Sequence, residues 1–301
     1  MQCLLCTDKA VFSSPSYCKK HFICYIEARV KKTIERFHLI GNNKKENNNR
    51  EKIAVAVSGG KDSQTVLYIL HKLYGDRVHG IAIDEGIPGY RDKTLKDLEQ
   101  FCTTYSIPFQ IYSFKEKYGK TLNHFPVLGG SICNTCGVLR RYLLNEKAHG
   151  FDEIATGHNL DDECQSIVMN LFKGNSFLSA KLGPKSGVLS SEGFTQRIKP
   201  LYLCTEKEIA TYAFLQGFPV GFIECPNAAD VFRSKVRDGL NELEMKREGT
   251  KLHIVETFLK LLPSLKDIHA GVSPTLCVQC GKPSMNKICK ACTIMEADYV
   301  Y

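Results

Sequence analysis

The stretch at residues 53–63, IAVAVSGGKDS, constrains the possible folds of this 301-residue chain more than any other feature. Its first five residues are apolar and mostly β-branched, which predicts a buried strand, and the glycine pair that follows ends that strand. Residues 64–74 then place their apolar side chains on one helical face. A strand, a Gly-rich loop and a helix in this order direct backbone N–H groups and the positive end of the helix dipole at one point. The stretch therefore predicts an anion site.

The polar residues of this loop suit a polyphosphate. Ser58, Lys61 and Ser63 supply two hydroxyl donors and a cation. The loop is not a Walker A motif, because Val55 occupies the position where that pattern needs its first glycine. The competing interpretation is a polar surface turn, and the strand and helix on either side argue against it.

The composition limits the class of protein. The chain is 43% hydrophobic and 24% charged, which suits one large domain with small appendages. It has no apolar run of about 18 residues and no secretion signal at its N-terminus, so we expect no membrane span and a cytosolic location. Fourteen cysteines in such a chain predict metal or sulfur chemistry rather than disulfides.

The net charge says little about the partner. The formal charge of +8 suggests an acidic partner such as tRNA or ATP. Metal-bound thiols are deprotonated, so two zinc sites and one three-cysteine cluster would lower that charge by about 4, to roughly +4. Any basic surface must then be local.

Both ends of the chain carry paired knuckles with the spacing of structural zinc sites. Each pair supplies four ligands that can close a tetrahedron around Zn²⁺, and segments this short have no other core. At the N-terminus Cys24 is an alternative to His21, and unrelated thiols are the competing interpretation. The expected ligands are Cys3, Cys6, Cys18 and His21 for one zinc and Cys277, Cys280, Cys289 and Cys292 for the other.

Between the knuckles, helices and strands alternate. Further strands are expected at 78–83, 109–114, 152–156 and 196–201, with helices at 91–105, 136–149, 161–172 and 205–216. This order predicts an α/β fold with a doubly wound parallel sheet, whose ligand lies beyond the carboxyl ends of the strands. Asp84 and the turn at 156–162 come out at that edge. Gly157 would let the backbone approach adenosine, and Asp161 or Asp162 would hold Mg²⁺, with helix capping as the alternative.

Three cysteines form a candidate sulfur site. Cys133 and Cys136 make a lone CxxC in a Gly-rich loop, for which a redox dithiol, half a zinc site and chance are all open. Cys225 would bring a third thiol to the same edge of the sheet. Three thiolates can hold a 4Fe–4S cluster whose fourth iron is open to sulfide. We expect Cys102, Cys164 and Cys204 to be core residues.

The chain divides by pattern into five segments. A basic helix at 25–39 and helices at 230–246 and 252–262 either contact RNA or present ordinary solvated faces. The expected segments are an N-terminal zinc ribbon at 1–24, a helix and polar linker at 25–50, the main domain at 51–228, a helical RNA-binding segment at 229–270 and a C-terminal zinc ribbon at 271–301. The RNA candidates are Arg140, Arg141, Arg233 and Arg237.

Taken together, SGGKDS, CxxC, GHNLDD, the late Cys225-Pro226 and the two terminal knuckle pairs resemble the tRNA uridine 2-sulfurtransferases, a group of PP-loop ATP pyrophosphatases with a HUP-like core. The resemblance covers almost the whole chain. It implies catalytic roles for Cys133, Cys136, Cys225, Lys61 and Asp62. It implies ATP binding by Ala56, Ser58, Gly59, Gly60, Lys61, Asp62, Ser63, Ile83, Asp84, Gly157, Asp161 and Asp162. One departure from the family pattern is Asn227, where an aromatic residue is expected in the wall of the sulfur site.

The resemblance also implies a mechanism and partners. ATP and Mg²⁺ would adenylate the C2 carbonyl of a uridine at the wobble or T-loop position of tRNA, and sulfur from the cluster would then expel AMP. The sulfur donor would be a ubiquitin-like carrier with a C-terminal thiocarboxylate, or free sulfide, and the enzyme would be a homodimer. Alternatives are a persulfide route through Cys133 and Cys225, tRNA cytidine thiolation, amination of an adenylated base, and a noncatalytic RNA-binding zinc-ribbon protein.

Overall fold

The computed structural model describes residues 1–41, 51–186, 195–221, 223–227, 231–271 and 274–297. Its centre is a six-stranded sheet in the order β5-β4-β3-β6-β8-β7. Neighbouring strands are parallel except at the β7–β8 edge, so the predicted parallel sheet is confirmed with one short antiparallel addition. The strands are β3 (Ile53–Val57), β4 (Val78–Asp84), β5 (Phe109–Ser113), β6 (Glu153–Ala155), β7 (Lys185–Ser186) and β8 (Gln196–Ile198).

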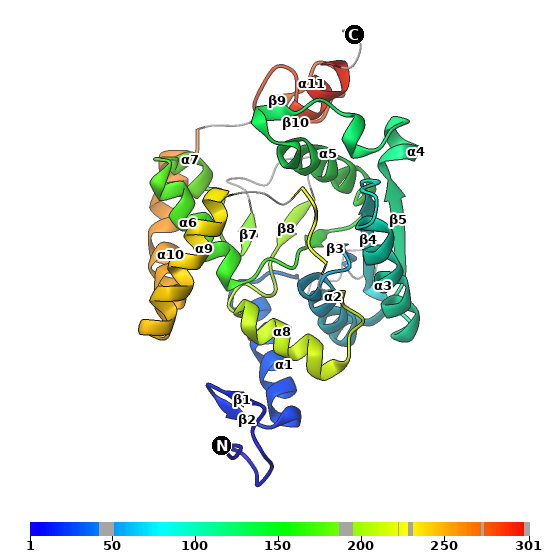
Figure 1. The fold of residues 1–301 in the computed structure, drawn as a ribbon. Helices are drawn as coiled ribbons and strands as arrows, with labels where there is room; N and C mark the ends of the chain where they lie inside the picture. The colour runs from blue at the N-terminus through cyan, green and yellow to red at the C-terminus, as the bar shows by residue number, and fades with distance from the viewer. Residues whose placement is uncertain (42–50, 187–194, 222, 228–230, 272–273, 298–301) are drawn as a thin grey trace.

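Helices cover both faces of this sheet, as the alternating pattern requires (Figure 1). Because successive residues of a strand face opposite sides, Ile53, Val55 and Val57 pack into one core and Ala54 into the other. The first core includes α1 (Lys19–Arg36), α2 (Lys61–Tyr74), α3 (Arg91–Thr104) and α8 (Glu206–Gln216). The second includes α4 (Phe114–Tyr118), α5 (Ile132–Lys147) and α11 (Lys290–Glu296).

A third core lies beside the sheet. It joins apolar residues of α6 (Leu160–Phe172), α9 (Val231–Lys246) and α10 (Thr250–Ile268), with α7 (Ser176–Ser179) packed against α6 and α10. Short 3-10 helices connect other elements: η1 (Gly75–Arg77), η2 (Leu122–His124) and η3 (Leu128–Gly130). Helices α6, α9 and α10 thus form a bundle at one side of the sheet (Figure 1).

Two small hairpins carry the terminal cysteine clusters and lie at opposite ends of the molecule (Figure 1). The hairpin of β1 (Phe12–Ser13) and β2 (Ser16–Tyr17) leads into α1, which packs against α8. The hairpin of β9 (Thr275–Leu276) and β10 (Pro283–Ser284) leads into α11, which packs against α5. The two clusters therefore support different faces of the main domain.

Several element bounds differ from the predictions. Helix α5 begins at Ile132 rather than 136, so the CxxC lies in its first two turns and not in a loop. The reason is Ser131, whose side chain accepts a hydrogen bond from the Cys133 N–H and caps the helix. Helix α1 begins at Lys19, and α4 and α7 were not predicted. The predicted linker lies almost wholly outside the described residues.

Within the described ranges, no helix combines the length and the apolar character that crossing a bilayer requires.

Candidate active site and metal centres

The Gly-rich loop after β3 is held by its own side chains. Ser63 Oγ accepts from the Ser58 N–H at 3.2 Å and donates to the Gly60 carbonyl at 2.9 Å. Gln64 Nε2, fully buried, donates to the Gly59 carbonyl at 3.1 Å. These bonds within the chain shape the loop, and α2 begins directly behind it with no side chain capping its first N–H groups.

Two glycines of the site are required by close packing. Gly59 has φ +86°, and a Cβ there would lie 2.2 Å from the Thr94 carbonyl oxygen. A Cβ on Gly157 would lie 2.9 Å from the Ser63 nitrogen. Gly157 thus brings the β6–α6 turn against the start of α2, whereas the sequence suggested an approach to adenosine. Any larger residue at either position would push the loop apart.

Lys61 already has anionic partners. Its Nζ lies 3.1 Å from Asp62 Oδ2 and 2.9 Å from Glu206 Oε1, and its side chain is 20% exposed. Burial acts to lower the pKa of Lys61, but Asp62 and Glu206 outweigh it and raise that pKa above its usual value. Lys61 is therefore a cation at the mouth of the loop, positioned by Glu206.

The aspartates near the Gly-rich loop differ in the partners that their carboxylate oxygens bind. Asp161 accepts from Lys251 Nζ and from the Glu206 N–H, so both of its oxygens are engaged away from the loop. Asp162 completes a capping box with Asn159 at the start of α6, and burial, foremost, raises the pKa of Asp162 to about 6. Asp62 Oδ1 accepts from Asn159 Nδ2 at 3.1 Å, which joins the two loops.

The remaining predicted ATP residues line the ends of β3 and β4. Ala56 is partly buried, and Ile83 is buried. Asp84 accepts a hydrogen bond from the Gly86 N–H at 2.8 Å and so shapes the turn after β4. This bond closes a turn and caps no helix, because α3 begins only at Arg91.

Cys133, Cys136 and Cys225 come together where α5 begins. Cys133 is exposed and donates to the Asn227 carbonyl at 2.7 Å, which brings the loop of Cys225 onto the helix. Cys136 and Cys225 pack against the same apolar core. Burial, foremost, and the charge of Glu85 raise the pKa of Cys136 to about 12, while Arg140 acts in the opposite direction.

The three thiols are more widely spaced than a zinc site. Among the described residues, only the two terminal groups bring all their ligand atoms within 4.8 Å of one another. A 4Fe–4S cluster binds each thiolate through a different iron, so its cysteines must stand further apart than the ligands of one ion. Three thiols that are not gathered around a single ion, with Cys136 and Cys225 half-buried, are compatible with such a cluster.

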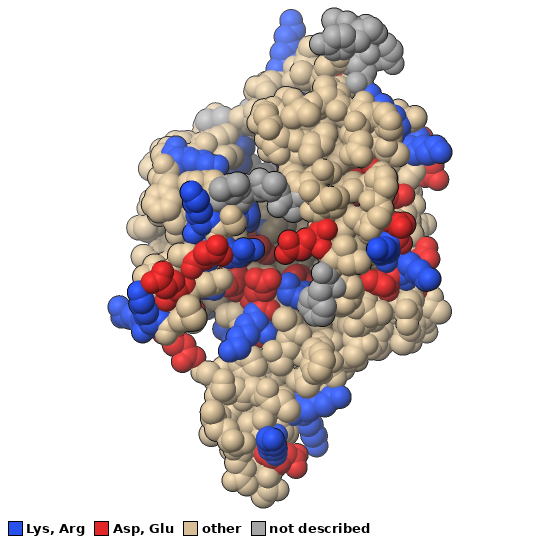
Figure 2. Space-filling model, in the orientation of Figure 1, with Lys and Arg blue, Asp and Glu red and all other residues tan. Residues whose placement is uncertain are grey.

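Charged groups of both signs lie on one face of the molecule (Figure 2). Figure 2 shows Lys, Arg, Asp and Glu side chains around a recess at the centre of the face. Desolvation, foremost, and the charges of Lys199, Arg140, Arg233 and Arg197 lower the pKa of His158 to about 3. His158 is therefore neutral at physiological pH.

The four predicted RNA arginines differ in their contacts. Arg140 is 53% exposed and pairs with Glu85 at 3.3 Å. Arg141 has exposed surface. Partial desolvation of its guanidinium, foremost, and the nearby positive charge of Arg140 lower the pKa of Arg141. Arg233 donates to Gln165 at 3.3 Å, and Arg237 pairs with Asp238. All four have exposed surface, which is compatible with phosphate contacts.

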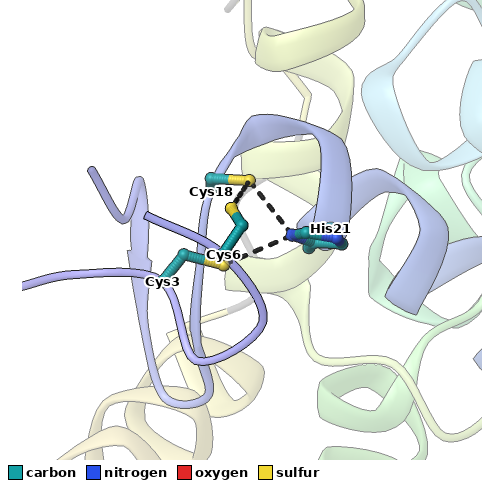
Figure 3. Close-up of side chains that lie close together, drawn as sticks. All are labelled: Cys3, Cys6, Cys18 and His21. Atoms are coloured by element: carbon teal, nitrogen blue, oxygen red, sulfur yellow. Dashed lines mark hydrogen bonds between the residues drawn. The ribbon is translucent and has the colours of Figure 1, made fainter. Parts of the chain in front are cut away.

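The N-terminal cluster brings together the four predicted ligands (Figure 3). His21 Nδ1 lies 3.4 Å from Cys3 Sγ and 3.3 Å from Cys18 Sγ, and Cys6 Sγ lies 3.6 Å from Cys18 Sγ. Cys24 is exposed and outside the group. The grouping therefore favours His21 over Cys24, because the early start of α1 puts His21 in its first turn, beside the three thiols.

The C-terminal cluster is similar in build. Cys277 and Cys292 lie 3.9 Å apart, and Cys280 and Cys289 lie 3.8 Å apart. The Cys289 N–H donates to Cys277 Sγ, as expected for a thiolate ligand. Both clusters are small, closed sets of soft or borderline ligands, and such a set suits Zn²⁺ in a structural role.

Sequence reasoning missed several residues of the site. Glu85 and Arg91 are each 3% exposed and lie between the Gly-rich loop and the cysteines, and Glu206 holds Lys61. Their positions depend on contacts between distant segments, so no local spacing marks them. The three expected core cysteines, by contrast, are all buried: Cys102, Cys164 and Cys204.

Comparison with known proteins agrees with this geometry. A family model described as a PP-loop domain matches residues 27–243. The tRNA-5-methyluridine(54) 2-sulfurtransferase of Pyrococcus horikoshii is 36% identical, over 97% of this chain and 93% of its own. The cytoplasmic tRNA 2-thiolation protein 1 of Saccharomyces cerevisiae is 33% identical, over 98% of this chain and 85% of its own.

A solved structure is similar over nearly the whole length. The U34-tRNA thiolase NcsA from Methanococcus maripaludis, solved with its 4Fe–4S cluster, matches with a TM-score of 0.82 and 32% identity. The match covers 99% of this chain and 96% of that one. It therefore includes both terminal clusters as well as the central sheet.

Proposed function

This chain belongs to the PP-loop family of tRNA 2-sulfurtransferases, and from that membership we propose that it is an ATP-dependent enzyme that replaces the C2 oxygen of a tRNA uridine with sulfur. The observation that carries the proposal is the hydrogen bond from Cys133 to the Asn227 carbonyl. That contact joins the loop of Cys225 to the start of α5. It supports a three-cysteine site on the same edge of the sheet as the Gly-rich loop.

The Gly-rich loop would activate the carbonyl. The N–H groups at the start of α2 and Lys61 would bind the phosphates of ATP, while Asp62 or Asp162 would hold Mg²⁺. The uracil C2 oxygen forms a bond to the α-phosphorus, and the bond between the α-phosphorus and the bridging oxygen breaks, so pyrophosphate leaves. The weak electrophile at C2 is then attached to AMP, a good leaving group.

The cysteines would hold the group that presents the sulfur. Cys133, Cys136 and Cys225 would hold a 4Fe–4S cluster, which when bound would supply an iron able to bind sulfide. Sulfide would attack C2, the C2–oxygen bond would break, and AMP would leave with the former carbonyl oxygen. Arg140 or Arg141 would bind an adjacent phosphate.

The terminal clusters would have a structural role. We propose that each holds one Zn²⁺, so residues 1–24 and 271–301 flank the catalytic domain at 51–228 as zinc ribbons, with a helix and linker at 25–50.

Helices within 229–270 would contact tRNA through Arg233 and Arg237. We further propose a cytoplasmic homodimer that receives sulfur from a ubiquitin-like carrier or as free sulfide.

The proposal is tested by purifying the full chain without oxygen and measuring its iron, sulfide and zinc. The protein is then given tRNA, sulfide and ATP, and the release of AMP and pyrophosphate is measured. Both products should appear only when tRNA and sulfide are present. Full activity without iron would favour a persulfide route instead. No AMP release would leave only a noncatalytic RNA-binding role.

A further inference from the structure

A buried carboxylate connects the Gly-rich loop with the sulfur site. Glu85 follows directly after β4 and is 3% exposed. Its Oε2 lies 2.9 Å from Arg91 Nε, and its Oε1 lies 3.3 Å from Arg140 Nη1. One carboxylate thus bridges two arginines from different elements, α3 and α5.

Arg91 is fixed on the side of the Gly-rich loop. Its Nη1 donates to the Ser58 carbonyl at 2.5 Å, and its Nε and Nη2 donate to the Ile83 carbonyl at 2.9 and 2.5 Å. Ser58 and Ile83 stand at the carboxyl ends of β3 and β4. A planar guanidinium with this many partners has one orientation, so Arg91 ties Glu85 rigidly to the loop.

Arg140 is held far less firmly. Its side chain is 53% exposed, and the bond to Glu85 is its one hydrogen bond among the described residues. Arg140 lies four residues after Cys136 on α5, so the two side chains share a helix face. Without Glu85, nothing in the described part of the chain would keep this guanidinium beside the cysteine.

The two charges act on the sulfur with opposite signs. Glu85 lies 3.3 Å from Arg140, and Arg140 stands one helical turn after Cys136 on α5, so a negative and a positive charge lie together near this thiol. Together Glu85 and Arg140 therefore add little net charge at the site, whereas either residue alone would add one unit of charge. Cluster potentials depend on nearby charge, so this balance has a measurable consequence.

We propose that Glu85 is a positioning residue for sulfur transfer: anchored to the Gly-rich loop by Arg91, it holds Arg140 beside Cys136 and balances its charge. The inference rests on the proposed function and adds a link between the ATP and sulfur sites. Glu85 touches no substrate. Its effect passes through Arg140, whose remaining N–H groups are available to a phosphate oxygen.

The test compares Glu85→Gln, Arg140→Gln and the double variant in full-length protein reconstituted with iron and sulfide. The reduction potential of the bound cluster is measured in each. Removing the negative charge should shift the potential upward, and removing the positive charge should shift it downward. The double variant should return close to the wild-type value.

Kinetics separate positioning from folding. In Glu85→Gln, kcat should fall by roughly 10–100-fold, as for partners that orient a metal site, while KM for ATP changes little. Glu85→Asp keeps the charge but is shorter, so its potential should stay near wild type while kcat remains low. Glu208→Gln is the matched control, because Glu208 is also buried and pairs with an arginine, Arg29, but lies between α1 and α8.

Unchanged potentials in Glu85→Gln and Arg140→Gln, or an equal shift in Glu208→Gln, would overturn the inference. Should Glu85→Gln fail to fold, Arg140→Gln alone decides, since it alters a half-exposed side chain. A wild-type protein that binds no cluster at the three cysteines would instead remove the proposed function, and this inference with it.

Discussion

Cys133 Sγ lies 2.7 Å from the main-chain oxygen of Asn227, a residue 94 positions later in the chain. The contact uses the backbone of Asn227 and not its side chain, so the absence of an aromatic residue at this position leaves it intact. It fixes the loop of Cys225 on the first turn of α5. The sulfur site is therefore assembled by tertiary contact from two short segments.

Replacing one cysteine of this site should remove its iron and leave the zinc of the two terminal clusters in place. We expect Cys225→Ser to lose bound iron and all thiolation while keeping the zinc content of the wild type, because Cys225 belongs to neither terminal cluster. Metal analysis and a thiolation assay check this. Cys24→Ser is the control, since Cys24 is an exposed thiol outside all three sites and should change neither. Simultaneous loss of iron and zinc in Cys225→Ser would mean that the thiol is assigned to the wrong site.

The two terminal clusters should differ in their effect on iron. Lys282, in the C-terminal hairpin, lies 3.0 Å from Glu146 on α5, and Ala291 and Ile294 pack in the core that Cys136 contacts. Cys280→Ser should therefore release zinc and also weaken iron retention, because α5 loses its support. The matched variant Cys6→Ser should release zinc and keep iron, since α1 packs on α8 at the other end.

Equal iron retention in Cys280→Ser and Cys6→Ser, measured after gel filtration without oxygen, would show that α5 does not depend on the C-terminal cluster.

Glu206 should compete with ATP for Lys61. Its carboxylate lies 2.9 Å from Lys61 Nζ and is 48% exposed. Half-exposed ion pairs contribute less than about 1 kcal/mol, so Glu206→Gln should tighten ATP binding by roughly 2–5-fold. Calorimetry with a nonhydrolysable ATP analogue measures this. Weaker binding would indicate that Glu206 itself contributes to the nucleotide site.

Ionisation of the Glu153 carboxyl should lower the free energy of unfolding as pH rises. Burial, foremost, with Glu51 and Asp152 raises the pKa of Glu153 to about 7, above its usual 4.5. A raised pKa means that the folded state favours the protonated acid. The stability this provides is present below pH 4.5 and is lost as pH rises through about 7. The Glu153→Gln variant has no carboxyl to ionise, so this pH-dependent loss of stability should be absent. The variant should be more stable than the wild type at pH 8 and similarly stable at pH 4.5.

Urea unfolding at the two pH values checks this prediction. Equal stability of the two proteins at pH 8 would contradict it, and Glu99→Gln, on the surface of α3, controls for the general loss of one charge.

Local sequence patterns predicted most of the fold. The apolar runs of β3, β4 and β5 and the period of α2, α3 and α8 gave elements within a few residues of those observed. The antiparallel strand β7 was missed because two residues carry no periodic signal. The start of α5 was placed too late because Gly129 and Gly130 suggested a loop, although Ser131 is a good N-cap.

The metal ligands were easier to predict than the rest of the site. Knuckle spacing brings four ligands together within a short segment, so Cys3 and Cys277 and their partners needed no knowledge of the fold. Glu85, Arg91 and Arg140 meet only because α3 and α5, which pack on opposite faces of the sheet, both contact β4. Asp161 looked like a metal ligand in sequence, but Lys251 from α10 reaches it in the folded chain.

The central claim is that this chain uses a cluster on Cys133, Cys136 and Cys225 to put sulfur on a tRNA uridine. The most direct test is a single-turnover reaction of the reconstituted protein with ATP, labelled sulfide and tRNA, followed by mass spectrometry of the nucleosides. The account predicts labelled 2-thiouridine at the wobble or T-loop position, in an amount that rises with bound cluster and vanishes in Cys225→Ser. Equal yields from iron-free protein, or a label found on cytidine, would contradict it.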